Sequence, residues 1–157
     1  MRTDNGSSNW KAAELQVSYN KKDNPREKIV QSSDAFKVFR AMWDDSLIDI
    51  QEQFCVLYLN RANKVIGFRR ISTGTLQSTT VDIQLILSCA LLCRASSMIL
   101  AHNHPSDNTV PSQADQQITS KIKAAALLMD IVVLDHLILS SDKNDERFYS
   151  FADEGVL

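Results

Sequence analysis

Cysteine, excess positive charge and long apolar runs are all scarce in this 157-residue chain. The three cysteines, Cys55, Cys89 and Cys93, are an odd number at unrelated spacings, which disfavours a disulfide framework and indicates a reducing compartment. Lys and Arg number 17 against 19 Asp and Glu, which gives a formal net charge of −2. No global positive field is available, so autonomous nucleic-acid binding is not expected.

No segment approaches the roughly 18 consecutive apolar residues of a membrane span, and the opening MRTDNGSSNWKAAELQ contains no apolar run typical of a signal peptide. We therefore predict a cytoplasmic protein without membrane attachment. Residues 1–24 are predicted to be a leader, disordered in its first part, with a possible short strand at 14–20. Residues 25–157 are predicted to form one domain.

The chain does contain alternating helix and strand patterns. Helical spacing of apolar residues covers 32–43, with Ser32 or Ser33 as the cap, 83–97 after Asp82 as the N-cap, and 112–129. Strand patterns cover a hairpin of residues 53–60 and 64–72, then 98–101, 131–140, and a short strand within 147–155. Because strands and helices interleave without a repeat, we predict a single α/β layered domain with a mixed sheet.

The segment AHNHPSDNTVPSQAD, residues 101–115, places two histidines at i and i+2 where a strand ends. Extended residues alternate faces, so the imidazoles of His102 and His104 point the same way and one cation could bridge them. Asp115 follows in the first turn of a helix whose start is set by Pro111 and Ser112. Two histidines and one carboxylate are typical of catalytic zinc, whose open position holds a water with its pKa lowered to about 7.

These residues also have ordinary structural explanations. SQAD fits a capping box, in which Asp115 satisfies backbone N–H groups at the helix start instead of binding a metal. His136 alternates with apolar neighbours in LDHLIL, so it is either a core histidine with its hydrogen bonds satisfied or a residue that orients a ligand. Cys89 and Cys93 lie four apart on an apolar helix, where core packing explains them better than metal ligation.

HNHPSDNTVPSQAD resembles the metal-binding signature HxHPx6SxxD of the JAMM (MPN) metalloprotease superfamily, and the wider sequence is similar to its bacterial RadC branch. The resemblance covers about residues 25–157 and includes FCVLYLNRANKVIGFRRISTGTLQS, MILAHNHPS and LDHLILSSDKNDERFYSFADEG. It implies a RadC-like JAB/MPN domain, a three-layer αβα sandwich of the cytidine-deaminase-like kind. The deaminase signature of HxE with PCxxC does not occur in the sequence, so deamination is not expected.

The resemblance also implies a role for each site residue. His102, His104 and Asp115 match the ligands of one Zn²⁺ per chain, and Ser112 matches a serine that helps to stabilise the oxyanion. Glu52, in QEQF just before the hairpin, matches the glutamate that takes a proton from the zinc-bound water and gives it to the leaving nitrogen. Without the resemblance, Glu52 would be interpreted as a solvated residue before a strand.

The chain departs from the RadC pattern at several points, of which two bear on function. Asp107, Asn108 and Thr109 stand where glycine or proline is usual, which we expect to affect loop rigidity and substrate contacts but not metal ligation. The chain is also expected to lack the helix-hairpin-helix region of full-length RadC proteins, so a DNA role that depends on this region is not expected.

The predicted function is a zinc-dependent hydrolase that cleaves a peptide or isopeptide bond in an unidentified peptide or protein substrate. The alternative is an interaction module associated with DNA repair or recombination, as the traditional RadC label suggests, with a non-catalytic zinc. Structural zinc is normally held by four protein ligands, whereas three are apparent here, which favours the hydrolase.

Overall fold

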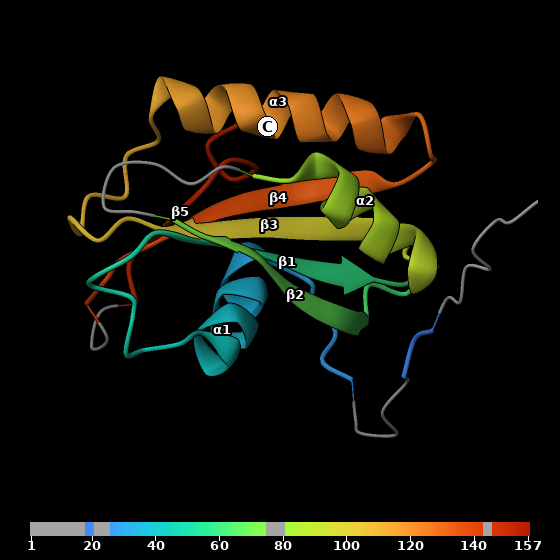
Figure 1. Cartoon of the computed structure of the whole chain (residues 1–157), viewed down its shortest axis with the longest axis horizontal. Helices are drawn as coiled ribbons and strands as arrows, with labels where there is room; N and C mark the ends of the chain where they lie inside the picture. The colour runs from blue at the N-terminus through green and yellow to red at the C-terminus, as the bar shows by residue number, and fades with distance from the viewer. Residues whose placement is uncertain (1–17, 21–25, 75–80, 143–145) are drawn as a thin grey trace, which may run out of the picture.

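A computed structural model of the chain describes residues 18–20, 26–74, 81–142 and 146–157. Five strands form one mixed sheet in the order β2-β1-β3-β4-β5, with α1 on one face and α2 and α3 on the other (Figure 1). The elements are α1 (Ser32–Met42), β1 (Gln53–Leu59), β2 (Val65–Thr73), α2 (Ile83–Leu92), β3 (Ser97–Asn103), α3 (Gln113–Leu127), β4 (Val132–Leu139) and β5 (Phe148–Ser150). The predicted three-layer αβα sandwich with a mixed sheet is confirmed.

The pairing of the central strands positions the predicted metal-binding residues. β1 pairs antiparallel with β2 and β3, β3 pairs parallel with β4, and β4 pairs antiparallel with β5. All seven residues of β1 and all seven of β3 are buried, as expected for strands covered on both faces. α3 is the crossover between the parallel strands β3 and β4, so its first turn lies near the carboxyl end of β3.

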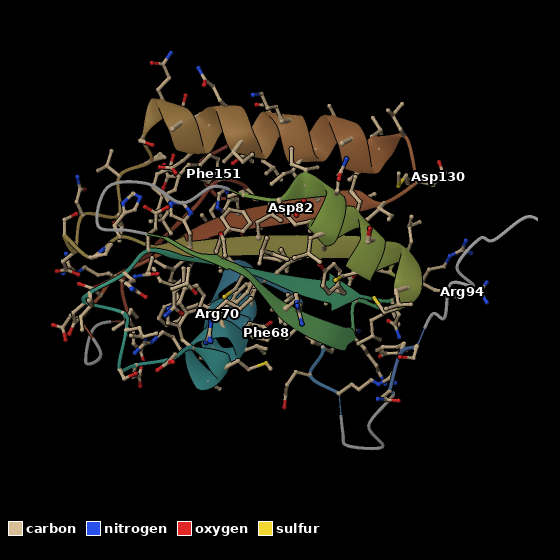
Figure 2. The ribbon with its side chains drawn as sticks, viewed as in Figure 1. Phe68, Arg70, Asp82, Arg94, Asp130 and Phe151 are labelled. Carbon is tan, nitrogen blue, oxygen red and sulfur yellow. The ribbon has the colours of Figure 1, made fainter. Side chains whose placement is uncertain are left out.

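Alternate residues of the strands divide the core into two layers. Phe68 and Arg70 of β2 lie on the α1 side of the sheet (Figure 2). The fully buried members of the α1-side core are Ala35, Phe39, Ile48, Cys55, Leu57, Leu59, Ala101, Leu137 and Leu139; those of the opposite core are Val56, Ile86, Ala90, Met98, Leu100, Ile122 and Ala126. Each buried Leu, Ile or Phe contributes about 1.5–3 kcal/mol, so packing on both faces holds the strand ends in place.

The start of α1 differs from the prediction. Its N-cap is Gln31, not Ser32 or Ser33. The Asp34 carboxylate accepts hydrogen bonds from the backbone N–H groups of Val30 and Gln31, at 3.0 and 3.2 Å. Asp34, in the first turn, therefore satisfies N–H groups that lie just before the helix. The expected serine cap would instead have accepted from an N–H group inside the first turn.

The end of α2 also differs, because the helix stops at Leu92 and not at residue 97. Arg94 adopts a left-handed φ of 55°, and its N–H donates to the Leu91 carbonyl at 3.1 Å. The N–H of Ala95 donates to the Ala90 carbonyl at 2.9 Å, which completes the double hydrogen bond typical of a helix that ends in a left-handed residue. β3 therefore begins earlier than predicted. The predicted N-cap of α2, Asp82, is confirmed, since its carboxylate accepts from the N–H of Leu85.

The predicted strand at residues 14–20 lies mostly outside the described residues. Within them, the Tyr19 hydroxyl donates to the Ile66 carbonyl on edge strand β2, and Lys28 forms an isolated antiparallel bridge with Lys64. Among the helices in the described ranges, none has the length and apolar character needed to cross a membrane.

Candidate metal centre

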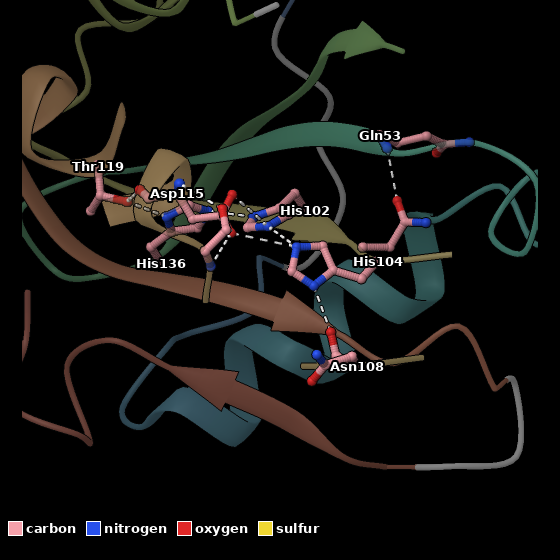
Figure 3. Close-up of polar contacts among 9 residues, drawn as sticks. Gln53, His102, His104, Asn108, Asp115, Thr119 and His136 are labelled. Atoms are coloured by element: carbon pink, nitrogen blue, oxygen red, sulfur yellow. Dashed lines mark hydrogen bonds and ion pairs between the residues drawn. The ribbon is translucent and has the colours of Figure 1, made fainter. Parts of the chain in front are cut away.

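Strand β3 delivers two histidines to the same side of the sheet. His102 is the penultimate residue of β3, and His104 directly follows the strand. Their Nε2 atoms lie 3.0 Å apart (Figure 3). The prediction that alternation along an extended segment brings both imidazoles together is therefore confirmed. The two side chains differ in exposure, at 1% for His102 and 17% for His104.

Asp115 approaches both histidines from the first turn of α3. Its Oδ1 lies 3.2 Å from His102 Nε2, and its Oδ2 lies 3.5 Å from His104 Nε2. Asp115 also completes a capping box with the N-cap Ser112, whose backbone N–H donates to Oδ2 at 2.7 Å and whose hydroxyl accepts from the Asp115 N–H at 3.1 Å. The capping and metal-binding explanations are thus compatible, because the helix cap holds the carboxylate against the imidazoles.

The three side chains fit one zinc ion. In a tetrahedral site with metal–ligand distances of about 2.0–2.1 Å, neighbouring donor atoms are about 3.3 Å apart. The donor pairs here are separated by 3.0, 3.2 and 3.5 Å. Two imidazole nitrogens and one carboxylate also match the ligand preference of zinc. Among the described residues, His102, His104 and Asp115 are the group able to hold a metal, and we call these three the donor cluster.

Hydrogen bonds within the donor cluster shift the pKa values of Asp115 and His104. Burial acts to raise the pKa of Asp115, but hydrogen bonds from His102 and His104 outweigh it and hold this pKa well below its ordinary value. The hydrogen bond with Asp115 is also the main reason that the pKa of His104 is raised, against the effect of burial.

His104 is held by the loop that follows it. Its Nδ1 is hydrogen bonded to the backbone carbonyl of Asn108 (Figure 3). Because a carbonyl can only accept, Nδ1 carries the proton and the neutral imidazole presents the lone pair of Nε2 to the donor cluster. The tautomer that metal binding requires at His104 is thus fixed by the main chain.

The same loop is anchored by Asp107, one of the three residues that depart from the RadC pattern. Asp107 adopts a φ of 62°, a left-handed conformation that glycine tolerates best and Asp and Asn tolerate better than most residues. Its carboxylate accepts hydrogen bonds from the Ser140 hydroxyl and from Arg147 Nη2, the latter at 2.9 Å. These bonds, led by that from Ser140, lower the pKa of Asp107. The loop is therefore attached to the segment between β4 and β5.

His102 is held by two buried residues from regular elements. Its Nδ1 lies 2.8 Å from Nε2 of His136 on β4, and His136 Nδ1 lies 2.6 Å from the Thr119 hydroxyl on α3 (Figure 3). His136 is fully buried, and this burial is the main reason that its pKa is well below the ordinary value. Of the two explanations for His136, orientation of a ligand is therefore supported. Nothing in the sequence singled out Thr119.

His136 is itself fixed by the segment after β5. The ring of Phe151 stacks on it, with centroids 4.8 Å apart and an interplanar angle of 15°. Asp135 accepts a hydrogen bond from the Ser150 hydroxyl at 2.7 Å and another from the Ala152 N–H at 3.0 Å. The turn that carries Phe151 is therefore tied to β4 directly beside His136.

Asn103, between the two histidines, points to the other side of β3. Its Oδ1 accepts from the Gln53 N–H at 2.8 Å, while its Nδ2 donates to the carbonyls of Ile48 and Gln51 at 2.7 and 3.0 Å. Sequence reasoning missed this residue, although the alternation that brings the histidines together also directs the residue between them to the opposite face. Asn103 therefore fixes the segment that precedes β1.

Glu52 lies in this fixed segment. β1 and β3 pair Phe54 with His102, and continuing the antiparallel register places Glu52 opposite His104. The carboxylate of Glu52 is close enough for its charge to contribute to the raised pKa of His104. The Glu52 carbonyl also accepts from the Gly74 N–H at 2.8 Å, which ties the segment to the end of β2. The predicted acid/base residue is thus placed alongside the more exposed histidine.

The cysteines lie away from the donor cluster. Cys55 is fully buried in β1, and burial raises its pKa to about 12. Cys89 and Cys93 are partly buried on α2 and pack against the core on that side. Core packing therefore explains these residues, as the sequence predicted.

Comparison with known proteins agrees with this geometry. Residues 29–156 match the family described as the RadC-like JAB domain. The chain belongs to this family. The RadC-like JAB domain described here is 43% identical over 130 residues to a UPF0758 protein of Flavobacterium johnsoniae, an alignment that covers 83% of this chain and 54% of the relative.

Two further relatives give the same result. A UPF0758 protein of Porphyromonas gingivalis is 39% identical over 132 residues, which is 84% of this chain and 56% of the relative. The UPF0758 protein YfjY of Escherichia coli is 43% identical over 107 residues, which is 68% of this chain and 64% of the relative. The chain thus spans a little over half the length of the first two relatives. These names specify no reaction, so the reaction has to be inferred from the site.

Proposed function

We propose that this RadC-like JAB domain is a zinc-dependent hydrolase of the JAMM type that cleaves a peptide or isopeptide bond in a peptide or protein substrate. The observation that carries the proposal is the donor cluster, with three protein ligands at spacings that suit tetrahedral zinc. Catalytic zinc typically has three protein ligands and one position for water or substrate, whereas structural zinc typically has four protein ligands. The ligand number therefore favours hydrolysis over an interaction module.

In this proposal, His102 Nε2, His104 Nε2 and the Asp115 carboxylate hold the zinc. When bound, zinc polarises the scissile carbonyl and lowers the pKa of a coordinated water to about 7. The remaining steps belong to side chains of this chain, and the structure supports a position for each.

Glu52 is the proposed general base and then general acid. It takes a proton from the attacking water as the new carbon–oxygen bond forms, and it gives this proton to the leaving nitrogen as the carbon–nitrogen bond breaks. The products are a carboxylic acid and an amine, with no change of oxidation state. Support comes from the register that places Glu52 opposite His104 and from the three hydrogen bonds by which Asn103 fixes the surrounding backbone.

Ser112 is the proposed oxyanion donor. Its hydroxyl donates to Asp115 Oδ2 at 2.7 Å, so it lies directly beside the donor cluster, and the residue is exposed. Turning this O–H group from the carboxylate to the substrate oxygen would supply a hydrogen bond where negative charge develops. The position of Ser112 at the N-terminus of α3 adds a favourable helix dipole.

The cellular setting is part of the same proposal. We place the protein in the cytoplasm, where its three free cysteines would stay reduced. The net charge of −2 supports a protein or peptide substrate over autonomous binding to nucleic acid.

The first test is metal content and the role of Glu52. Purified protein should contain about one zinc per chain by mass spectrometry, and His104→Ala or Asp115→Ala should lose it. Glu52→Gln should keep the zinc but cleave peptide and isopeptide libraries about 10²- to 10⁴-fold more slowly than the wild type, the usual contribution of a general acid/base.

A matched variant controls for the loss of charge. Asp49 is an exposed acidic residue on the same segment, so Asp49→Asn should retain both zinc and the wild-type rate. Cleavage at equal rates by the wild type and Glu52→Gln would contradict the proposed role of Glu52. Full zinc retention in both ligand variants would contradict the metal centre.

A further inference from the structure

A continuous chain of hydrogen bonds joins two members of the donor cluster through the interior. It runs from His102 Nδ1 to His136 Nε2 at 2.8 Å, and from His136 Nδ1 to Thr119 Oγ1 at 2.6 Å. Thr119 Oγ1 then donates to the backbone carbonyl of Asp115 at 2.5 Å. The side chain of Asp115 faces His102 Nε2, so the chain starts and ends at metal-binding residues.

The last bond fixes the direction of all the others. The Asp115 carbonyl can only accept, so it takes the single proton of the Thr119 hydroxyl. Thr119 Oγ1 must then accept from His136, which places the His136 proton on Nδ1. His136 is fully buried, with Phe151 stacked on one face and Phe54 at its edge, surroundings that favour the neutral ring. Its Nε2 is therefore an acceptor.

The direction of these hydrogen bonds also determines which nitrogen of His102 carries a proton. Because His136 Nε2 accepts, His102 keeps a proton on Nδ1, and Nε2, which faces His104 and Asp115, is the nitrogen left to bind a metal. We propose that Thr119 and His136 are positioning residues that hold His102 in the tautomer and orientation required for metal binding. The inference rests on the metal centre of the proposed function and extends it by two residues that touch neither the metal nor the substrate.

Removal of the Thr119 hydroxyl should reverse the direction of the hydrogen bond between His136 and His102. Thr119→Val keeps the shape of the side chain but leaves His136 Nδ1–H without its acceptor, so the buried ring favours the Nε2–H tautomer. His136 would then donate to His102 Nδ1 and move the His102 proton to Nε2, where it blocks the metal. We expect zinc affinity, measured by competition with a chromophoric chelator, to fall about 10- to 100-fold, the usual effect of an outer-shell partner.

Two matched variants separate positioning from general damage to α3. Thr119→Ser restores the hydroxyl and should return the affinity to within about threefold of the wild type. Ser120→Ala is the control for loss of a helix hydroxyl, since Ser120 also donates to the carbonyl four residues earlier, Gln116, but is exposed. Its zinc affinity should not change. Wild-type affinity in Thr119→Val would overturn the inference and leave the proposed function intact.

The proton positions can be measured without any variant. Long-range ¹H–¹⁵N correlation spectra of the wild type, with and without zinc, should show a protonated Nδ1 and an unprotonated Nε2 for His136. A proton on His136 Nε2 would overturn the inference even if Thr119→Val failed to fold. Failure of the wild type to bind zinc would instead contradict the metal centre, and with it both proposals.

Discussion

The two histidines of the donor cluster are only two residues apart, yet their surroundings differ. His102 is almost fully buried and is supported by His136 on β4 and Thr119 on α3. His104 is more exposed and is supported by the Asn108 carbonyl in the following loop. In the proposed metal centre, we refer to His102 as the inner ligand and to His104 as the outer ligand. The proposed metal centre therefore combines a ligand built into the core with a ligand carried by a loop.

This difference should decide whether a substitution affects folding as well as metal binding. The supports of the inner ligand are strands and a helix whose apolar neighbours are buried, so its position is fixed by the same packing that stabilises the domain. The supports of the outer ligand depend on a loop attached through Asp107 to Arg147 and Ser140. Loss of the inner ligand should affect folding and metal binding together, whereas loss of the outer ligand itself should affect metal binding alone.

The largest expected effect comes from replacing each ligand in turn. His102→Ala and His104→Ala should both weaken zinc binding at least about hundredfold. This exceeds the about 10- to 100-fold loss that is usual when a residue that only supports a ligand is replaced. Only His102→Ala should also destabilise the metal-free protein, by about 1–3 kcal/mol, because it leaves a cavity and removes the buried partner of His136.

Urea denaturation in the presence of a chelator measures this difference. His104→Ala should unfold within about 0.5 kcal/mol of the wild type, as is usual for partly exposed positions away from the core. Equal destabilisation by the two variants would show that the inner and outer ligands are not distinct in the way described.

A smaller effect is expected from pH, and it should arise at the outer ligand. The hydrogen bond with Asp115 raises the pKa of His104 in the metal-free protein, so a proton occupies His104 below this raised pKa. Zinc must displace that proton, and its affinity should fall by about tenfold per pH unit for each proton released as the pH drops through the raised pKa. His136 should not contribute, because burial lowers its pKa and keeps it neutral.

Calorimetric titrations with zinc in buffers of different ionisation enthalpy count the protons released. Release of about one proton below the raised pKa of His104 is the expected result. An affinity that does not change between about pH 8 and about pH 5.5, around the ordinary histidine value, would contradict the assignment.

The smallest effect is expected in the loop of the outer ligand. Asp107→Gly keeps the left-handed backbone accessible but loses the bonds to Ser140 and Arg147, while Asp107→Ala loses the bonds and also strains the backbone. Melting temperatures should therefore decrease from wild type to Asp107→Gly to Asp107→Ala, with zinc affinity lowered only a few-fold. An alanine variant that melts at or above the glycine variant would contradict this role of the backbone.

Local patterns in the sequence predicted much of the fold and of the donor cluster. The hairpin, the caps Asp82 and Ser112, and the shared direction of His102 and His104 depend on residues close in sequence, where alternation and capping rules apply. The end of α2 was not predicted, since Arg94 adopts a conformation that its side chain does not favour.

The supports of the inner ligand could not be predicted in this way. His136 approaches His102 because β3 and β4 pair in parallel with Leu100 beside His136, a register set by the α3 crossover and the packing of whole elements. Thr119 reaches the same point only because α3 lies over β4. Contacts of this kind depend on tertiary packing, for which a single sequence provides no local pattern.

The stacking of Phe151 on His136 has a consequence for the order of assembly during synthesis. A ribosome completes the segment containing His102, His104 and Asp115 well before it reaches residue 151. At that stage β4, β5 and the turn held by Asp135 do not yet exist, so His136 is not in place to hold the imidazole of His102. A nascent chain thus carries the complete motif without a complete binding site, and zinc loading should follow the arrival of its last strands.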